Sequence, residues 1–235
     1  SWIIKYAKYK KIIWENSVLS KRIISWILNV ELILNKSTFH FKRNFLSSIV
    51  TQTNHIKKNL KFEKNYTKKI EIITALLLSG LVFKEYKDNF NFGLRELEKI
   101  VKVFFDSNGF PLSRNPEELI HFTRYLILSR ECIKDAQQYI PEFLDEIINK
   151  NLNCMKNILT PDKKVPLFNG GTEEDLTEFD NFLEDLKYKP VLKKEIVGGV
   201  LSLNYKKNII FFDVGEPPRK DFSKSYQSGP LSFEY

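Results

Sequence analysis

His121 and Tyr125 lie four residues apart, a spacing that places both rings on one face of a helix. Histidine titrates near neutral pH and tyrosine carries a phenolic proton, so the pair is a candidate general base and general acid. The alternative is a half-buried aromatic pair that only packs its helix.

Three further side chains are candidates for holding a substrate. Arg114 could bind a carboxylate or sulfate through two parallel hydrogen bonds, or it could tie its turn to a neighbouring helix. His55 belongs to a polar cluster with Gln52 and Asn54, which could line a cleft or face solvent. Asn169 precedes two glycines, in a tight turn where the backbone can approach a sugar or a neighbouring segment.

Metal and cofactor chemistry has little support in these residues. Two cysteines, Cys132 and Cys154, are too few for a disulfide framework or a zinc site, so we expect free buried thiols. We find no phosphate-binding loop, zinc-ligand spacing or Ser-His-Asp arrangement. The sequence therefore assigns no metal ligand and no cofactor.

Positive charge is concentrated in the N-terminal part of the chain. Residues 1–70 contain 15 Lys and Arg against 3 Asp and Glu, whereas residues 141–185 are acidic. A basic half suits a polyanionic partner, such as an acidic polysaccharide, nucleic acid or an anionic membrane. The acidic stretch and the lack of a nucleic-acid-binding motif weigh against nucleic acid. The alternative is a solvated helical surface in a lysine-rich protein.

Helices must position these residues, because apolar side chains recur at helical spacing over the first 185 or so residues. The helix predicted over residues 67–83 is apolar almost all round in its C-terminal half, so we expect it to be buried. Long helices with short polar connections favour antiparallel pairs, which are compatible with an incomplete α/α toroid. The other predicted helices span residues 2–14, 17–34, 38–60, 91–105, 115–137, 141–159 and 173–186.

The pattern changes to β-structure near residue 190. Residues 191–205 and 208–214 are rich in strand formers and are interrupted at Gly198-Gly199, and residues 231–235 indicate a further strand. About three strands do not close a sheet that buries its own face, so we expect the β-domain to continue beyond them. The predicted domains are 1–188 and 189–235.

Composition indicates a folded chain, with 43% hydrophobic and 14% aromatic residues. No apolar run is long enough to span a bilayer, and no secretory signal is visible, which leaves a cytoplasmic location open. The chain opens on Ser1 rather than Met, so we expect residues to precede it.

Four short segments, in this order, resemble motifs of the heparinase II/III-like polysaccharide lyases, and of a proteobacterial subgroup in particular. Residues 106–116 resemble the family's D-G-G-h-x-x-R-S-P turn, and residues 166–171 resemble its P-L-F-N segment. Residues 211–218 resemble the glycine-proline turn of its first sandwich strands, and residues 228–234 its H-A-D-x-L-S-F-E strand. The resemblance implies a mainly α two-domain α+β fold, with an incomplete α/α toroid followed by the first strands of an antiparallel β-sandwich.

The resemblance also implies an activity, β-elimination on uronic-acid polysaccharides, and a place in the cell envelope or periplasm. In that reaction a base removes the proton next to the uronate carboxylate while polar or cationic groups neutralise the carboxylate. An acid then assists the departing sugar oxygen. The implied partner is an acidic polysaccharide, and the family often has a zinc ion in its β-domain.

Two catalytic positions of the toroid hold other residues in this sequence. Thr67 and Lys68 stand where many members of the resembled family have an Asn-His pair. Glu118 stands where members have a tyrosine soon after the R-S-P turn. The toroid therefore predicts a lyase scaffold whose chemistry must come from different residues.

The strand that resembles H-A-D-x-L-S-F-E also lacks the family's histidines. Ser225, Tyr226 and Gln227 take the places of the catalytic and zinc-binding residues, Gly229 replaces the Asp, and no histidine follows His121. Two functions stay open. The first is a lyase that uses other residues, or residues beyond this chain. The second is a catalytically inactive glycan- or cell-envelope-binding protein on the same scaffold.

Overall fold

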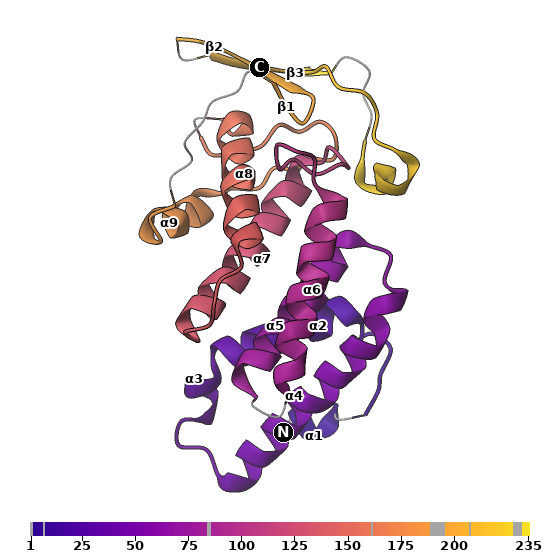
Figure 1. The fold of residues 1–235 in the computed structure, drawn as a ribbon, viewed down its shortest axis with the longest axis vertical. Coiled ribbons are helices and arrows are strands. Elements are labelled where there is room, and N and C mark those ends of the chain that lie inside the picture. Colours follow the sequence, from indigo (N-terminus) through magenta and orange to yellow (C-terminus); the bar gives the residue numbers. More distant parts are fainter. Residues whose placement is uncertain are drawn as a thin grey trace. The chain divides into compact units, whose positions relative to one another are not determined.

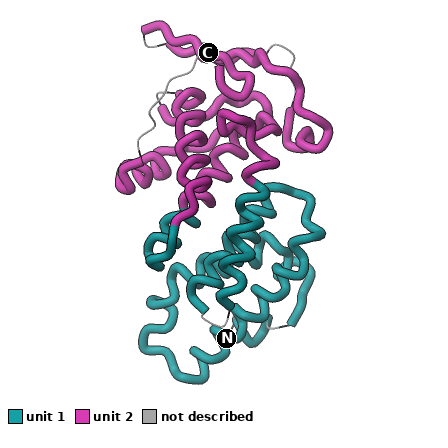
Figure 2. Tube along the Cα trace, viewed as in Figure 1, with its two compact units in different colours: residues 1–100, 128–139 teal, residues 101–127, 140–235 magenta. Residues whose placement is uncertain are grey.

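The structure is a computed structural model that describes residues 2–6, 8–83, 86–160, 162–188, 196–206, 208–227 and 232–235. Helices are followed by a four-stranded antiparallel sheet, which confirms the predicted mainly α fold with strands at its end (Figure 1). Contacts divide the chain into two compact units (Figure 2). Unit 1 comprises residues 1–100 and 128–139, and unit 2 comprises residues 101–127 and 140–235. The predicted domain boundary after residue 188 adjoins residues 189–195, which lie outside the described residues.

Unit 1 is built from helices whose apolar faces pack around α5 (Tyr66–Val82). Every residue from Ile70 to Gly80 in α5 is buried, which confirms the predicted burial of this helix. α2 (Asn16–Leu28) packs on α5 and on α4 (Phe39–Asn59). The other elements of this unit are α1 (Trp2–Lys5), α3 (Val30–Leu34), η1 (Leu60–Phe62) and most of α6 (Lys87–Phe104).

Two predicted helices of unit 1 are shortened or broken in the structure, and a third, α6, begins at Lys87 rather than at the predicted residue 91. The helix predicted over residues 2–14 is wrong, because α1 ends at Lys5 and the chain turns back. The Trp14 indole Nε1 donates to the Tyr6 carbonyl at 3.2 Å, a group that a continuing helix would pair with its own backbone. The helix predicted over residues 17–34 breaks at Asn29, whose side chain donates to the Ser25 carbonyl at 2.9 Å.

Unit 2 places the sheet beside helices. An aromatic cluster forms its core, with the Phe104 and Phe122 rings stacked 4.2 Å apart and Phe110 and Phe211 fully buried. The first part of α7 (Pro116–Asp135) belongs to this unit, and its last residues belong to unit 1. The other helices of unit 2 are α8 (Glu142–Ile158), α9 (Thr177–Asp185) and η3 (Lys220–Ser225).

The sheet has the order β1-β2-β3-β4, and each neighbouring pair is antiparallel. Its strands are β1 (Ile196–Val197), β2 (Val200–Tyr205), β3 (Asn208–Asp213) and β4 (Phe233–Glu234), and α8 contacts β1 and β2 (Figure 1). Gly198 and Gly199 turn the chain between β1 and β2 with φ of +57° and +77°, as their positions between strand-forming residues predicted.

Cys132 and Cys154 are free thiols, as expected, although only Cys154 is fully buried. None of the helices in the described part of the chain is long and apolar enough to cross a membrane.

Candidate functional site

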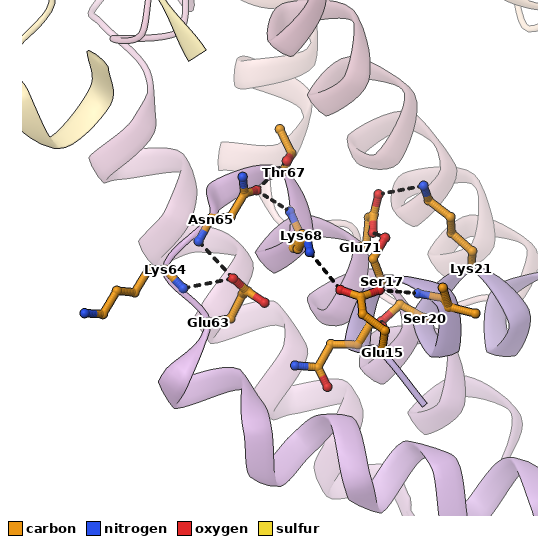
Figure 3. Close-up of polar contacts among 12 residues, drawn as sticks. Glu15, Ser17, Ser20, Lys21, Glu63, Lys64, Asn65, Thr67, Lys68 and Glu71 are labelled. Atoms are coloured by element: carbon orange, nitrogen blue, oxygen red, sulfur yellow. Dashed lines mark hydrogen bonds and ion pairs between the residues drawn. The ribbon is translucent and has the colours of Figure 1, made fainter. Parts of the chain in front are cut away.

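In unit 1 the first turns of α2 and α5 meet in a cluster of charged and hydroxyl side chains, which we call the α2–α5 cluster (Figure 3). Asn65 begins α5, because its side-chain oxygen accepts from the Lys68 N–H at 3.0 Å and from the Thr67 hydroxyl. Glu15 begins α2 in the same way, accepting from the Val18 N–H at 3.1 Å. Both residues satisfy backbone donors that the helix leaves unpaired.

Lys68 joins the two helix starts. Its Nζ lies 2.8 Å from Glu15 Oε1, and the two side chains are 43% and 36% exposed. The hydrogen bond to Glu15 raises the pKa of Lys68 above its ordinary value, slight burial opposes this, and the charges of Glu15, Glu63 and Glu71 add to the rise. Burial alone would raise the pKa of Glu15, but the bonds from Lys68 and Val18 hold it below its ordinary value. The pair is therefore ionised at neutral pH.

Glu71 lies beneath this pair on the buried face of α5 and is 3% exposed. The Ser17 hydroxyl donates to one of its oxygens, and Lys21 Nζ lies 3.2 Å from the other. A carboxylate buried in an apolar stretch needs such partners, because desolvating an unpaired charge costs several kcal/mol. Glu71 therefore fixes the register of α2 on α5 and leaves Lys68 as a half-exposed cation at the rim.

In unit 2 the turn between α6 and α7 holds Arg114, whose φ is +61° and which is 7% exposed. Its guanidinium donates to the carbonyls of Gly198 and Glu216 at 3.0 Å and of Gly199 at 3.2 Å, and it pairs with Asp213. Substrate binding by Arg114 would require these bonds to break. The geometry therefore favours the alternative in which it ties its turn to a neighbour, although the neighbour is the sheet rather than a helix.

The four segments that carried the resemblance meet in unit 2. Arg114 joins the first segment to the third through Asp213. The Leu167 N–H donates to Glu234 Oε2 at 2.6 Å, which joins the second segment to the fourth. The Asp213 N–H donates to the Ser232 carbonyl at 2.9 Å, which joins the third to the fourth. These motifs hold helices against the sheet, so they identify a fold more directly than a chemistry.

Glu118, in the first turn of α7, was not selected from the sequence as a site residue. Ser113 Oγ donates to it at 2.5 Å, Ser225 also bonds to it, and burial raises its pKa above the ordinary value. Because Asn115 caps the same helix and its Nδ2 donates to the Ser225 carbonyl at 2.9 Å, this carboxyl sits at a junction of two segments. A glutamate in a first helical turn is a common capping pattern. Its place at the position of the resembled family's tyrosine was the signal that could have selected it.

His121 and Tyr125 adopt the predicted arrangement on α7. Their ring centroids lie 4.9 Å apart with an angle of 49° between the planes, and both are half-buried. Proton transfer by this pair stays a prediction.

Asn169 is fully buried with a φ of +58° in unit 2. Within the described residues neither its amide oxygen nor its amide nitrogen has a hydrogen-bond partner. Its turn lies close to α7, because a Cβ on Gly170 would meet the Asn115 Nδ2 at 2.5 Å. Sugar binding by Asn169 stays a prediction, and the amide is closed to solvent in this conformation.

His55 lies in unit 1, whereas the other four predicted site residues lie in unit 2. Its ring packs 5.8 Å from that of Tyr9 and 5.2 Å from that of Trp14. Burial lowers the pKa of His55, and the charge of Lys58 lowers it further. The ring is therefore neutral at pH 7 and takes part in an aromatic group rather than an ion pair.

A family model described as Heparinase II/III N-terminus matches residues 1–192. The chain belongs to the heparinase II/III family. The heparan sulfate lyase HepC from Pedobacter heparinus has a similar fold, with a TM-score of 0.68 at 14% identity, over 90% of this chain and 39% of that one. The heparinase III BT4657 gene product has a TM-score of 0.68 at 15% identity, over 88% of this chain and 36% of that one. A further heparinase III structure has a TM-score of 0.66 at 15% identity, over 90% of this chain and 40% of that one.

These structural matches establish the shared fold, and the chain spans about two fifths of the length of each of those proteins. A search of curated proteins found no match. In this family fold Thr67 and Lys68, which take the place of the Asn-His pair in the resemblance, belong to the α2–α5 cluster. The resemblance and the geometry therefore both indicate the α2–α5 cluster as the candidate site of unit 1.

The zinc ion expected from the resemblance does not fit the residues present. Ser225, Tyr226 and Gln227 occupy the corresponding positions, and none of them is a usual zinc ligand. No group of three His, Cys, Asp or Glu side chains that could hold a metal occurs among the described residues. Gly229, which replaces the family's Asp, lies outside them.

Proposed function

We propose that the chain forms the toroid part of a polysaccharide lyase that acts on uronic-acid-containing glycans. The family match over residues 1–192 carries this proposal. The excess of 15 Lys and Arg over 3 Asp and Glu in residues 1–70 supports an acidic glycan as the partner. Activity on such a glycan would be a property of the whole protein, and this chain spans about two fifths of the length of the similar structures.

Lys68 is the residue we propose for neutralising the uronate carboxylate. Its bond to Glu15 keeps it protonated, so it can supply a positive charge but cannot act as the base at neutral pH. A cation there lowers the energy of the carbanion-like transition state, in which the carboxylate gains charge. The position is also where the resembled family has its Asn-His pair, so a polar neutralising group would be replaced by a charged one.

The elimination also needs a base and an acid. The base takes the proton from the carbon next to the carboxylate, and that electron pair forms a double bond to the neighbouring carbon. The bond from that neighbour to the glycosidic oxygen breaks, and the oxygen gains a proton from the acid. No water is consumed, and one product carries a double bond conjugated with its carboxylate.

Substituting Lys68 with methionine should lower kcat/KM on a cleaved uronate glycan by about 100-fold or more. The reason is that the positive charge that stabilises the transition-state carboxylate is lost. The fold should persist, since the half-exposed Glu15–Lys68 pair contributes at most about 1 kcal/mol. The measurement is the ultraviolet absorbance of the unsaturated product, with the full-length protein incubated with heparin, alginate and related uronates.

The matched control is Lys69→Met, one position along α5, where Lys69 lies over the Tyr66 ring at 5.1 Å. That change should alter kcat/KM by less than about threefold, because it leaves the α2–α5 cluster intact. Equal losses in the two variants would rule out a specific role for Lys68.

A non-catalytic glycan-binding protein is the second candidate function. It is favoured by Ser225, Tyr226 and Gln227 at the positions of the family's histidines. Tight binding of heparin or alginate, without unsaturated product from any uronate tested, would establish this function and exclude the lyase.

A further inference from the structure

Unit 1 carries an aromatic and basic surface at its N-terminal end, which we call the Tyr9 surface. It is made by the rings of Tyr6, Tyr9 and His55 and by Lys5, Lys8, Lys10, Lys11 and Lys58. Its residues come from α1, from the turns that follow it, and from the second half of α4. α1 packs on α4, so segments about fifty residues apart in sequence form one surface (Figure 1). None of these residues belongs to the α2–α5 cluster.

Trp14 holds this surface in place. It is 7% exposed, its indole donates to the Tyr6 carbonyl at 3.2 Å, and its ring meets the His55 ring edge-on. Tyr9 packs against both rings, with centroid distances of 6.2 Å to Trp14 and 5.8 Å to His55. Tyr9 is nevertheless 64% exposed, so a positioned aromatic ring presents most of its area to water. Such a ring gains free energy when an apolar face, such as the C–H face of a sugar, covers it.

The charge around Tyr9 is uniformly positive. Residues 1–14 contain no acidic side chain, and Lys8, Lys10 and Lys11 are all exposed. Lys5 and Lys10 place their Nζ atoms 5.5 Å and 5.1 Å from the centroid of the Tyr6 ring. Among the described residues no carboxylate pairs with any lysine between residues 5 and 11. These ammonium groups can therefore bind anions without first leaving a carboxylate.

We propose that the Tyr9 surface is a binding site for acidic polysaccharide, with a sugar ring against Tyr9 and carboxylates or sulfates on the neighbouring lysines. The choice of glycan as the polyanion rests on the proposed function. A single-stranded nucleic acid needs successive open rings for successive bases. Here the Tyr6 ring is flanked by lysines, so Tyr9 is the exposed ring of this surface.

The test measures heparin binding to the full-length protein by calorimetry, at low and high salt, with two variants. Replacing Lys8, Lys10 and Lys11 with alanine should weaken binding at least tenfold at low salt, and this loss should shrink at high salt because exposed charges are screened. Tyr9→Ala should weaken binding by roughly fivefold to tenfold at both salt concentrations, because stacking is not screened. Tyr9 is mostly exposed, so its removal should leave the melting temperature unchanged.

The matched control removes three positive charges elsewhere in unit 1, at Lys36, Lys42 and Arg43, which are also exposed. It should weaken heparin binding by less than threefold. A loss as large as that of the Lys8, Lys10 and Lys11 variant would overturn the proposal in favour of diffuse attraction. Tighter binding of a single-stranded DNA with the same number of charges, lost in the same variants, would overturn it in favour of nucleic acid.

The cleavage assay separates this proposal from the proposed function. Tyr9→Ala should keep its kcat on a short uronate oligosaccharide, whereas Lys68→Met should lose cleavage. If no uronate glycan is cleaved, the lyase proposal fails while the binding measurements still decide the Tyr9 surface. If cleavage occurs but Tyr9→Ala binds heparin as the unaltered protein does, only the Tyr9 proposal fails.

Discussion

Replacing Arg114 with methionine should destabilise unit 2 by about 3–5 kcal/mol, the cost of leaving a buried charge without its partner. Asp213 is 7% exposed and would lose that partner, while the carbonyls of Gly198, Gly199 and Glu216 would lose a donor. The measurement is chemical denaturation with hydrogen–deuterium exchange of the unit 2 amides, because the three tryptophans of the chain all lie in unit 1 and would report that unit instead.

A second ion pair of unit 2 provides the control. Arg124 Nη1 lies 2.7 Å from Glu174 Oε1, but the two side chains are 38% and 37% exposed. Arg124→Met should therefore cost less than about 1 kcal/mol, because water solvates and screens both charges. If the two arginine variants lost equal stability, burial of the Arg114–Asp213 pair would not be the cause.

The double variant with Arg114→Met and Asp213→Leu should be more stable than Arg114→Met alone. Removing both charges leaves no unpaired carboxylate, and apolar side chains can replace a buried ion pair at little cost. A Cβ added at Gly199 or Gly215 would lie 2.6 Å from the Arg114 guanidinium, so the side chain at position 114 passes close to both glycines. Unbranched methionine is therefore the replacement for arginine. If the double variant is no more stable than Arg114→Met, the lost stability comes from the three carbonyls without a donor rather than from the unpaired Asp213.

Gly80→Ala should destabilise unit 1 by about 2 kcal/mol, although alanine is the better helix former. A Cβ at position 80 would lie 2.2 Å from the Phe90 backbone nitrogen and 2.8 Å from its Cα. The backbone of α6 cannot move aside as a side chain can, so overpacking of about 3 kcal/mol outweighs a gain of about 1 kcal/mol in helix propensity. Thermal melting of the protein would measure the difference.

Gly93→Ala is the matched control on the facing helix. A Cβ there would lie 3.0 Å from the Leu77 Cβ and 3.1 Å from the Leu77 Cα and backbone nitrogen, so a backbone shift of a few tenths of an ångström relieves the contact, far less than Gly80 requires. The propensity gain should then roughly cancel the packing cost, leaving a change within about 0.5 kcal/mol. A Gly80 variant as stable as the Gly93 variant would mean that α5 and α6 separate easily at this point.

Helix positions followed well from the sequence wherever apolar residues recur at helical spacing. α4, α5, α7 and α8 begin and end within a few residues of their predicted bounds. α1 did not, because residues 5–12 have exposed lysines in place of an apolar stripe, and a helix there would bury too little to offset its ordering entropy. α9 begins at Thr177, four residues later than expected.

The site residues also divide into those whose neighbours follow from local spacing and those whose partners come from distant helices. Spacing alone placed His121 beside Tyr125, since residues four apart on a helix are neighbours. Glu71 carried a signal that sequence reasoning passed over, because a carboxylate within the buried stretch from Ile70 to Gly80 requires partners from another helix. Those partners, Ser17 and Lys21, lie about fifty residues earlier in the chain.

The sequence by itself determined the order of helices and strands, the family resemblance, the basic N-terminal part and the absence of the family's histidines after residue 121. These properties depend on residue type and local spacing. Only the tertiary structure decided that Arg114 pairs with Asp213 and that Glu15 holds Lys68 as a cation. Such pairings join residues about fifty to one hundred positions apart, and the charge or freedom of a side chain depends on which partner the packed helices bring to it.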